Sequence, residues 1–450
     1  MSDPARRILE QHKLADTIEL LLPDLVGVPR GKRVSRDALA GLLAGEGVFT
    51  TSLYAVDTTG ANVERSGLVW EEGDADRPLY LDPRTLRPVP WRETALQVIG
   101  GLREHDGSPF FADPRAILER VTARLVALGV RPVAALELEF YLLGEADPAG
   151  GGNPALAASA RHGAPPAEGE VWTHEKLEDH EAFFALVERW CRGQGLPYKG
   201  AIAEFSPGQF EVNLGHRADM LEAADETFAF KRLIKAAARA TGRRASFMAK
   251  PFADRSGSGL HVHVSLVDAQ GRNLLAAGAD GAVLLRRAIG GLQATMAEAM
   301  ALWAPNANSF RRLRPLSYAP TAPSWGWNNR TVALRIPKGP DQARRIEHRV
   351  AGADANPYLV LAAALAGIGH GLEHGLEASP PVTGNAYDQV PSSLPAGWAE
   401  AIACWRRATI LPGWLGERFV ALYATHRDAE RQRFEAIVTP TEHAWYLTTV

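Results

Sequence analysis

Four segments of the chain alternate polar and apolar residues, and this pattern predicts β-strands that each have one polar face. The segments are residues 134–142, 209–214, 260–266 and 345–350. The polar side carries Glu137, Glu139, Glu211, Asn213, His261, His263, Ser265, Arg345, Glu347 and Arg349. The residues between them are mostly apolar. We therefore expect a sheet with one charged face and one face turned toward a core.

Helices are expected between these strands. Asp113 marks a helix start, because Pro114 follows it and an amphipathic run continues to Gly129. Further helices are predicted at residues 225–240, 281–303, 356–372 and 398–429. Helices and strands mix without the regular alternation that builds a parallel sheet. The expected fold class is α+β with a mainly antiparallel sheet.

The same pattern divides the chain before Asp113. Upstream, the runs at residues 24–32, 48–56 and 67–80 are short and broken by Gly, Pro and Asp, which suggests a small sheet-rich domain. The predicted domains are therefore 1–112 and 113–450. Residues 144–170 are rich in Gly, Ala and Pro, so we expect an irregular surface insertion there.

Composition limits the classes of partner and the cellular location that are expected. The 450 residues include 49 basic and 52 acidic ones, and this balance does not favour nucleic acid or an anionic membrane as a partner. Cys191 and Cys404 are the only cysteines and are far apart, as suits a reducing cytosol. The charged N-terminus disfavours a signal peptide, and the apolar stretch 357–369 is too short to cross a bilayer. A cytoplasmic protein with a small-molecule partner is expected.

The acidic residues of the polar face suggest a metal site. Glu204 precedes the tight bend Ser206-Pro207-Gly208 and adds a fifth carboxylate to Glu137, Glu139, Glu211 and Glu347, beside the imidazole of His261. Like charges placed together repel unless cations lie between them, and oxygen ligands favour Mg²⁺ or Mn²⁺. Any one such segment alone is commonly a solvated sheet face. For His263 and Ser265, an ordinary sheet role stays open.

Arginines form a second group close in sequence to the acidic one: Arg311, Arg312, Arg330, Arg335, Arg345 and Arg349. Beside a metal cluster, planar guanidinium groups suit phosphate and carboxylate oxygens, and phosphoryl transfer requires both metal and cationic groups. The run Gly257-Ser258-Gly259 before His261 permits close approach of a ligand to the backbone, although such a turn is a weak signal alone.

Several ordered motifs make the chain resemble the glutamine synthetase family. They read LELEFYL, AEFSPGQFEVNL, AKPFADRSGSGLHVHVSL, NSFRRLRP, NNRTVALRIP and RRIEHRVAGADANPYL. The resemblance implies a small N-terminal β-grasp domain and a large catalytic domain. It also implies a homo-oligomer of two stacked hexameric rings, in which the neighbouring subunit's N-terminal domain completes each site.

The resemblance also implies roles for single residues. Glu139, Glu204 and Glu211 would hold one metal ion, and Glu137, His261 and Glu347 the other. Arg312, Arg349 and Gly257 would bind glutamate, while His263, Ser265, Arg330 and Arg335 would bind ATP; Arg312, Arg330 and Tyr318 are the candidate catalytic residues. The implied reaction forms γ-glutamyl phosphate from glutamate and ATP, and an amine then displaces phosphate.

The chain departs from glutamine synthetases where they bind ammonium. The family has a glutamate six residues after the substrate-binding arginine, and counting from Arg312 gives Tyr318. Its N-terminal Asp-Gly-Ser-Ser stretch is also absent, and the nearest segment is residues 49–53, FTTSL. Tyr318, Trp325 and Trp327 would make a wider, aromatic entrance, unless the tryptophans are core residues of the next strand.

These departures resemble the γ-glutamylpolyamine synthetase branch. The expected function is ATP-dependent ligation of glutamate to an organic amine, either a polyamine or a monoamine. Asp57 and Glu64 are candidates for the base that deprotonates the amine, provided that the N-terminal domain reaches the site. An ammonia-using glutamine synthetase and a non-catalytic relative are the alternatives.

Overall fold

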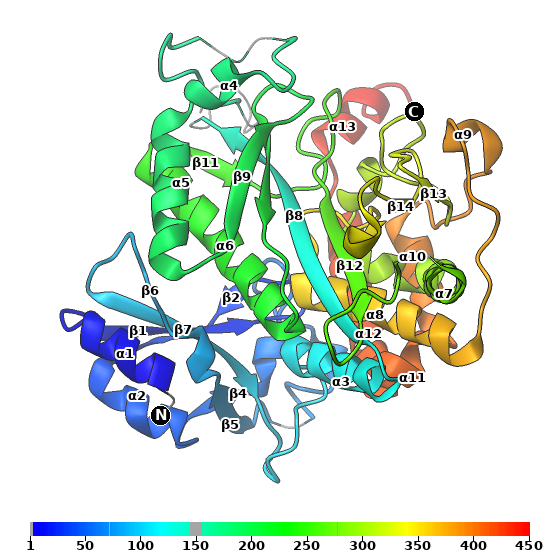
Figure 1. Ribbon diagram of the computed structural model, residues 1–450. Coiled ribbons are helices and arrows are strands. Elements are labelled where there is room, and N and C mark those ends of the chain that lie inside the picture. The colour runs from blue at the N-terminus through cyan, green and yellow to red at the C-terminus, as the bar shows by residue number, and fades with distance from the viewer. Residues whose placement is uncertain (1–2, 72, 145–154, 165, 167, 277) are drawn as a thin grey trace.

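The computed structural model describes residues 3–71, 73–144, 155–164, 166, 168–276 and 278–450. Two β-sheets, each accompanied by helices, organise this part of the chain (Figure 1). The first sheet is built from residues before position 103, and the second contains the strands with the predicted polar face. Among the described strands of the second sheet, only β13 (Trp325–Trp327) and β14 (Leu334–Ile336) pair in parallel. The expected α+β class with a mainly antiparallel sheet is confirmed.

The first sheet has the order β2-β1-β7-β5-β4, with β3 on β1 and β6 on β7. Its central strands β1 (Thr17–Pro23) and β7 (Ala95–Leu102) pair in parallel and are buried. The sequence pattern did not predict either one, because a strand buried on both faces shows no alternation. The other strands are β2 (Pro29–Arg30), β3 (Arg33–Ser35), β4 (Val48–Thr50), β5 (Asp76–Leu81) and β6 (Arg87–Pro88).

The second sheet has the order β13-β14-β15-β12-β8-β10-β9, with β11 on β8. The long strand β8 lies at its centre, and all four predicted strands are present, the last one shorter than expected. Their bounds are β8 (Arg131–Leu143), β9 (Tyr198–Ala203), β10 (Gln209–Leu214), β11 (Arg244–Ser246), β12 (Leu260–Val267), β13 (Trp325–Trp327), β14 (Leu334–Ile336) and β15 (Ile346–His348).

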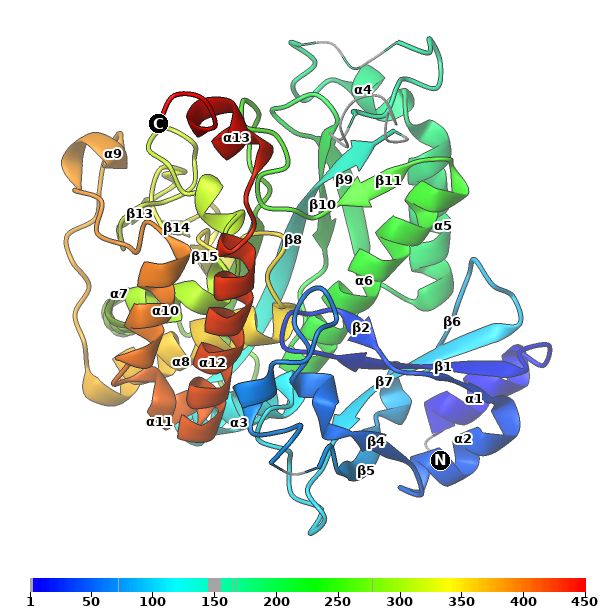
Figure 2. The ribbon, with the colours of Figure 1, turned by 180° about the vertical axis from the view of Figure 1, so that it is seen from behind.

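Helices flank β8 on both sides: α5 and α6 lie on one side, and α8 and α12 (Glu417–Glu435) lie on the other (Figure 2). Their capping follows the sequence, since the Asp113 side chain accepts a hydrogen bond from the Arg115 amide at 2.8 Å at the start of α3. Asp219 caps α6 in the same way, so α6 begins earlier than predicted. The bounds are α3 (Pro114–Ala127), α5 (Glu181–Gln194), α6 (Met220–Ala240), α7 (Ala279–Trp303) and α8 (Pro357–His374).

The crossing of α7 and α8 depends on close backbone contact. A Cβ atom at Gly291 of α7 would lie 2.1 Å from the Gly367 carbonyl oxygen of α8, so only glycine fits. The apolar residues of α8 are almost all buried, as the sequence predicted. None of the helices in the described ranges is both long and apolar enough to span a membrane.

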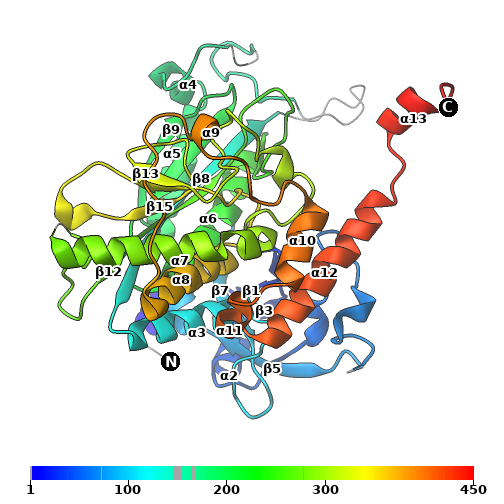
Figure 3. The same ribbon diagram turned by 90° about the vertical axis from the view of Figure 1, so that its right-hand side faces the viewer.

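The single helix predicted over 398–429 is wrong. The chain forms α10 (Trp398–Arg406), α11 (Leu411–Leu415) and α12 (Glu417–Glu435) instead. Pro412 lies in the first turn of α11, and Gly416 has a φ of 92° between α11 and α12. The last helix, α13 (Pro440–Tyr446), stands away from the body at the C-terminal end (Figure 3).

The remaining elements are short. They are α1 (Asp3–Gln11), α2 (Leu39–Leu43), α4 (His174–Glu178), α9 (Ala386–Gln389) and the 3₁₀ turns η1 (Arg36–Ala38), η2 (Thr51–Tyr54), η3 (Glu64–Ser66), η4 (Pro83–Thr85), η5 (Ser309–Arg311) and η6 (Asp341–Ala343). Of the predicted insertion, residues 145–154, 165 and 167 lie outside the described residues. Its described remainder is irregular, with an isolated bridge between Leu143 and Leu156.

Candidate active site

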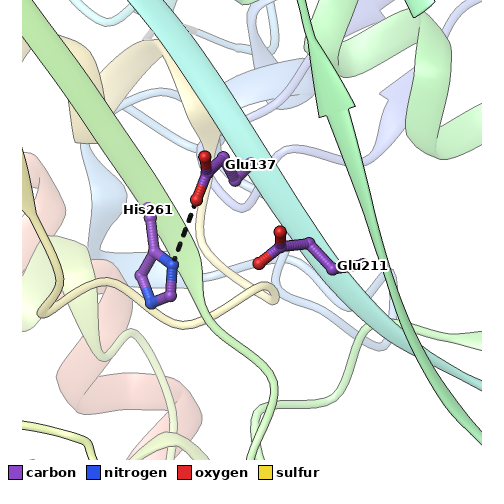
Figure 4. Close-up of side chains that lie close together, drawn as sticks. All are labelled: Glu137, Glu211 and His261. Carbon is purple, nitrogen blue, oxygen red and sulfur yellow. Dashed lines mark ion pairs between the residues drawn. The ribbon is translucent and has the colours of Figure 1, made fainter. Parts of the chain in front are cut away.

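Three neighbouring strands bring the predicted acidic and histidine residues together. Glu211 on β10 lies opposite Glu139 on β8, and His261 on β12 lies opposite Glu137 on β8. Figure 4 shows Glu137, Glu211 and His261 pointing toward one another from these strands. The period-two pattern in separate parts of the sequence therefore produces one shared polar surface.

Glu137 lies at the centre of this surface. Its Oε1 atom is 3.0 Å from Nε2 of His263, and its Oε2 atom is 3.6 Å from Nδ1 of His261. Two groups of three ligand atoms share Glu137, and within each group the atoms lie within 4.8 Å of one another. One group is Glu137, Glu211 and His261, and the other is Glu137, His263 and Glu347. Each group could surround one cation.

The charge on these carboxylates is costly without a cation. Burial, followed by the charges of Glu137, Glu139 and Glu204, raises the pKa of Glu211 to about 9. Burial and the charge of Glu139 likewise raise the pKa of Glu204 to about 7. Near neutral pH these carboxyls therefore retain protons that a divalent cation would displace. An oxygen-rich donor set of this kind fits Mg²⁺ or Mn²⁺.

Two other carboxylates are kept ionised by nearby positive groups. Burial alone would raise the pKa of Glu137, but the adjacent imidazoles of His261 and His263 outweigh it and lower the pKa well below its usual range. Burial also acts against ionisation of Glu347, where Arg349 makes the largest opposing contribution and the pKa falls to about 2. The surface thus combines fully charged and proton-retaining carboxyls, which lets it exchange protons for a cation.

Arginines surround Glu347. Nη1 of Arg335 donates to Glu347 Oε2 at 2.6 Å, and Nη1 of Arg349 donates to the other carboxylate oxygen. The Nε atoms of both arginines are buried and lack a hydrogen-bond partner among the described residues. Because an unpaired buried donor is unfavourable, each guanidinium group retains a donor suited to an anionic ligand.

Arg312 is positioned by backbone carbonyls. It donates from Nη1 to the Val350 carbonyl at 2.8 Å and from Nη2 to the Arg349 carbonyl at 3.1 Å. Gly257 packs directly against it, and a Cβ atom there would lie 2.6 Å from Cγ of Arg312 and 2.8 Å from the Ala249 carbonyl oxygen. The glycine-rich turn is therefore required by the close approach of this arginine.

Two supports of the site were missed by sequence reasoning. Lys176 of α4 donates from Nζ to the carbonyl oxygens of Glu204 at 2.8 Å and of Ser206 at 2.7 Å, which fixes the bend between β9 and β10. Gln209 donates from Nε2 to the Gly257 carbonyl at 3.0 Å. Gln209 lies two residues before Glu211 and so on the same face of the strand, which means that the sequence pattern could have identified it. Lys176 belongs to no recognisable pattern.

The site residues line a cavity of about 570 Å³. The predicted residues that it brings together are Glu137, Glu139, Glu204, Glu211, Gly257, His261, His263, Arg312, Tyr318, Arg330, Arg335, Arg345, Glu347 and Arg349. Arg311, Asp57 and Glu64 do not line it. Ser265 does not line it either, and its Oγ donates to the Arg344 carbonyl at 3.0 Å.

An aromatic mouth adjoins this cavity. A second cavity of about 740 Å³ shares Tyr318 and Arg330 with the first and is also lined by Trp327. Tyr318 is 58% exposed and Trp327 is 52% exposed, and no carboxylate of the described residues lines this second cavity. Trp325 is instead a core residue, because its indole nitrogen donates to the Ser379 carbonyl at 2.6 Å and its ring is buried. Of the two roles left open by the sequence, Trp325 therefore has the core one and Trp327 the entrance one.

Two further exposed aromatic residues, Trp172 and Phe205, line the main cavity, and sequence reasoning missed both. Phe205 follows Glu204 directly, and Trp172 precedes α4 with a φ of 60°. Exposed rings at the edge of a charged cavity offer apolar contact to a bound molecule. The position of Phe205 beside a predicted ligand was the only available signal.

Comparisons with known proteins agree with this geometry. The family model described as glutamine synthetase, catalytic domain, matches residues 111–446. The chain is 39% identical over 449 residues to the gamma-glutamylputrescine synthetase of Escherichia coli K12, covering 98% of this chain and 94% of that protein. It is 34% identical over 431 residues to the gamma-glutamylethanolamide synthetase of Streptomyces coelicolor, covering 95% and 91%. A solved GmaS/ADP complex aligns with a TM-score of 0.85 at 27% identity, covering 99% and 100%.

Proposed function

This chain belongs to the glutamine synthetase family, and we propose that its aromatic mouth selects an organic amine over ammonium. The family resemblance drawn from the motifs is confirmed, and the protein is an ATP-dependent ligase that joins glutamate to an amine. One observation supports this choice of acceptor. The exposed rings of Tyr318 and Trp327 line the mouth, and no carboxylate of the described residues lines it. A small ammonium ion needs negative charge, whereas an alkyl amine gains from aromatic surface.

The mouth is connected to the phosphate side of the site through one side chain. Asn328, next to Trp327, accepts a hydrogen bond from Nη2 of Arg335 at 2.8 Å, and Nη1 of the same arginine holds Glu347. Asn328 has a φ of 46°, a left-handed conformation that asparagine tolerates better than most residues. An acceptor bound against Trp327 would thus lie close to the groups that bind the reacting phosphate.

We further propose that the charged face binds divalent cations, Mg²⁺ or Mn²⁺. Glu139, Glu204 and Glu211 would hold one ion, and Glu137, His261 and Glu347 the other. The raised pKa values of Glu204 and Glu211 support cation binding at this face. The two closely spaced ligand groups divide the residues differently from this assignment, because Glu211 lies with Glu137 and His261 in one of them. The bound ions would neutralise negative charge on the phosphates and polarise the transferred group.

His263 is better suited to donate a hydrogen bond than to bind a metal ion. Its Nδ1 atom accepts from Nε of Arg345 at 3.0 Å, which leaves the proton of the neutral ring on Nε2. Nε2 lies 3.0 Å from Glu137. This arrangement supports the proposal that His263 faces the phosphates of ATP, although His263 also falls within one of the two possible ligand groups.

The proposed reaction has two steps. Arg312, Arg349 and the Gly257 backbone orient glutamate, while His263, Arg330 and Arg335 bind the ATP phosphates. Ser265 lies outside the lining of this cavity, so it could contact only the adenine end of ATP. A γ-carboxylate oxygen of glutamate attacks the γ-phosphorus, and ADP leaves with the electrons of the broken P–O bond. The neutral amine then attacks the carbonyl carbon of γ-glutamyl phosphate, phosphate leaves with the electrons of the broken C–O bond, and a base takes the extra proton from nitrogen, so that an amide remains.

The acceptor base is proposed to come from another subunit. Asp57 and Glu64 do not line the cavity of their own chain, and the Asp57 carboxylate accepts from Thr59 Oγ1 at 2.7 Å and pairs with Arg433. They could reach a site only from a neighbouring copy, as in the proposed dodecamer of two hexameric rings. We accordingly propose that residues 1–112 form a β-grasp domain and that residues 113–450 form the catalytic domain.

Release of ADP tests the choice of acceptor. Purified protein would be supplied with ATP, glutamate and Mg²⁺, and then with putrescine, ethanolamine, a simple alkylamine or ammonium at equal concentration. We expect an organic amine to stimulate ADP release more than ammonium does. Stimulation by ammonium alone would contradict the proposed acceptor, and no stimulation by any amine would favour a non-catalytic relative.

A further inference from the structure

A third cavity lies outside the candidate active site and the aromatic mouth, and it has a cationic wall. Its volume is about 790 Å³, and it shares no lining residue with the active-site cavity or the aromatic mouth. It lies between α6, β11 and the loop that leads into β2, and Figure 2 shows β2 beside α6. Its cationic lining residues are Lys231, Arg232, Lys235, Arg239, Arg244 and Arg427.

Three of these cations follow the helical repeat of α6. Lys231, Lys235 and Arg239 are spaced four residues apart, so they lie along one face of the helix. Like charges at this spacing destabilise a helix unless negative charge compensates for them. Among the described residues, no carboxylate forms an ion pair with Lys235 or Arg239. This face of α6 is therefore uncompensated within the described structure.

The carboxylates near the cavity are already engaged. Asp354 is the only acidic residue among its lining residues, and it accepts hydrogen bonds from Asn306 Nδ2 at 2.8 Å and from Ser309 Oγ at 2.7 Å. Arg232 pairs with Glu19 outside this lining. The positive charge of Lys235 and its neighbours is thus left for a molecule from solution.

Lys231 is the least exposed cation of this helix face. It is held at the cavity wall by a hydrogen bond from Nζ to the Ala353 carbonyl at 2.8 Å. Burial, and then the charge of Lys235, lowers the pKa of Lys231 to about 7. An anion beside it would favour its charged form.

The cavity also has an apolar wall. Nζ of Lys231 lies 5.3 Å from the ring centroid of Phe247, and Nζ of Lys235 lies 5.8 Å from it. Phe228 and Val28 line the same space. A cavity that combines cationic side chains with an apolar wall suits a small organic anion, whose carbon skeleton gains from the apolar contact, better than an inorganic ion alone.

We propose that this cavity binds a small organic anion with at least two negative charges, either carboxylates or a phosphate ester. Its charges would contact Lys231, Lys235 and Arg239 of α6, with Arg244 of β11 at the edge of the site. Its carbon skeleton would lie against Phe247. The site is independent of the glutamate and ATP sites, because none of its lining residues belongs to them.

Calorimetric titration of the full chain in metal-free buffer tests the proposal. The probes are succinate and glycerol 3-phosphate, which distinguish a carboxylate ligand from a phosphate one. We expect saturable binding of at least one probe and at least tenfold weaker binding by the Lys235→Gln, Arg239→Gln double variant. The control Arg192→Gln removes an exposed cation of α5 and should bind as the wild type does. Arg312→Gln, which alters the candidate active site, should also retain binding.

Two results would overturn the proposal. One is the absence of saturable binding for both probes up to about 10 mM, a concentration that detects even weak association. The other is unchanged binding by the double variant, because Lys235 and Arg239 would then make no contact with the probe. Unaltered glutamate- and amine-dependent ADP release by the double variant would show that it is folded.

Discussion

Replacing Glu211 with glutamine should stabilise the protein without metal and weaken its stabilisation by metal. Without a cation, Glu211 lies among Glu137, Glu139 and Glu204, and burial together with their charges raises its pKa to about 9. An acid whose pKa is raised in the folded state destabilises that state above its unfolded pKa. The destabilisation grows as pH rises from about 4.5 to about 9. Glutamine keeps the shape but cannot ionise, so it removes this dependence.

The size of the effect follows from the same shift. A carboxyl whose pKa rises from 4.5 to about 9 costs the folded state up to about 4 kcal/mol at pH 7.5 and about 1 kcal/mol at pH 5.5. For a chain of 450 residues, the entropy of unfolding is about 0.9 kcal/mol/K, so these values correspond to about 4 °C and about 1 °C in Tm. Conversely, a metal ion present at a hundred times its Kd raises the free energy of unfolding of the wild type by about 2.7 kcal/mol.

Thermal denaturation with and without Mn²⁺ measures both effects. In chelator, the Tm of Glu211→Gln should lie above that of the wild type, and the difference should grow from pH 5.5 to pH 7.5. Addition of Mn²⁺ should raise the Tm of the variant by less than it raises that of the wild type. Glu119→Gln is the matched control, because Glu119 is an exposed glutamate of α3 outside the cavity. A variant that melts below the wild type in chelator at pH 7.5 would refute the electrostatic reasoning. An undiminished gain from Mn²⁺ would remove Glu211 from the ligand set.

Three other variants or conditions give separate expectations. Binding of Mn²⁺ at pH 7 should release about 1.5 protons from Glu204 and Glu211, measured by calorimetry in buffers of different ionisation enthalpy. The affinity for Mn²⁺ should rise toward pH 9. If no protons are released, the raised pKa values are contradicted. Gly257→Ala should displace Arg312, cost about 1–3 kcal/mol of stability and raise KM for glutamate, whereas an unchanged KM would show that this contact is dispensable. Trp327→Ala should raise KM for the organic amine about tenfold and leave KM for ATP unchanged, since it removes apolar surface only at the mouth; equal changes in both would argue against that location.

The charged face could be predicted because its signal is local. Period-two spacing places Glu137 with Glu139, and it places His261 with His263, wherever the strands lie in space. Only the order of the strands in the sheet was needed to bring Glu211 opposite Glu139, and the motifs of the family supplied it. The Asp113 cap was predictable for the same reason, since a cap depends on its immediate neighbours.

Features that depend on tertiary packing could not be read in this way. Lys176 supports the bend at Glu204 from a separate helix, and nothing in its own segment indicates that contact. Trp325 and Trp327 are the same residue type and lie two positions apart on one strand. Trp325 is nevertheless buried against the Ser379 carbonyl, whereas Trp327 lines the mouth. The central strands of the first sheet lack alternation because both of their faces are covered.

The most direct test of the amine-ligase account is a competition between acceptors in a single reaction. Wild-type protein would receive ATP, glutamate and Mg²⁺ with equal concentrations of ammonium and putrescine or ethanolamine, and mass spectrometry would identify the products. The account predicts a γ-glutamyl amide of the organic amine in excess over glutamine. Glutamine as the dominant product would contradict it and would show that Tyr318 and Trp327 do not exclude ammonium.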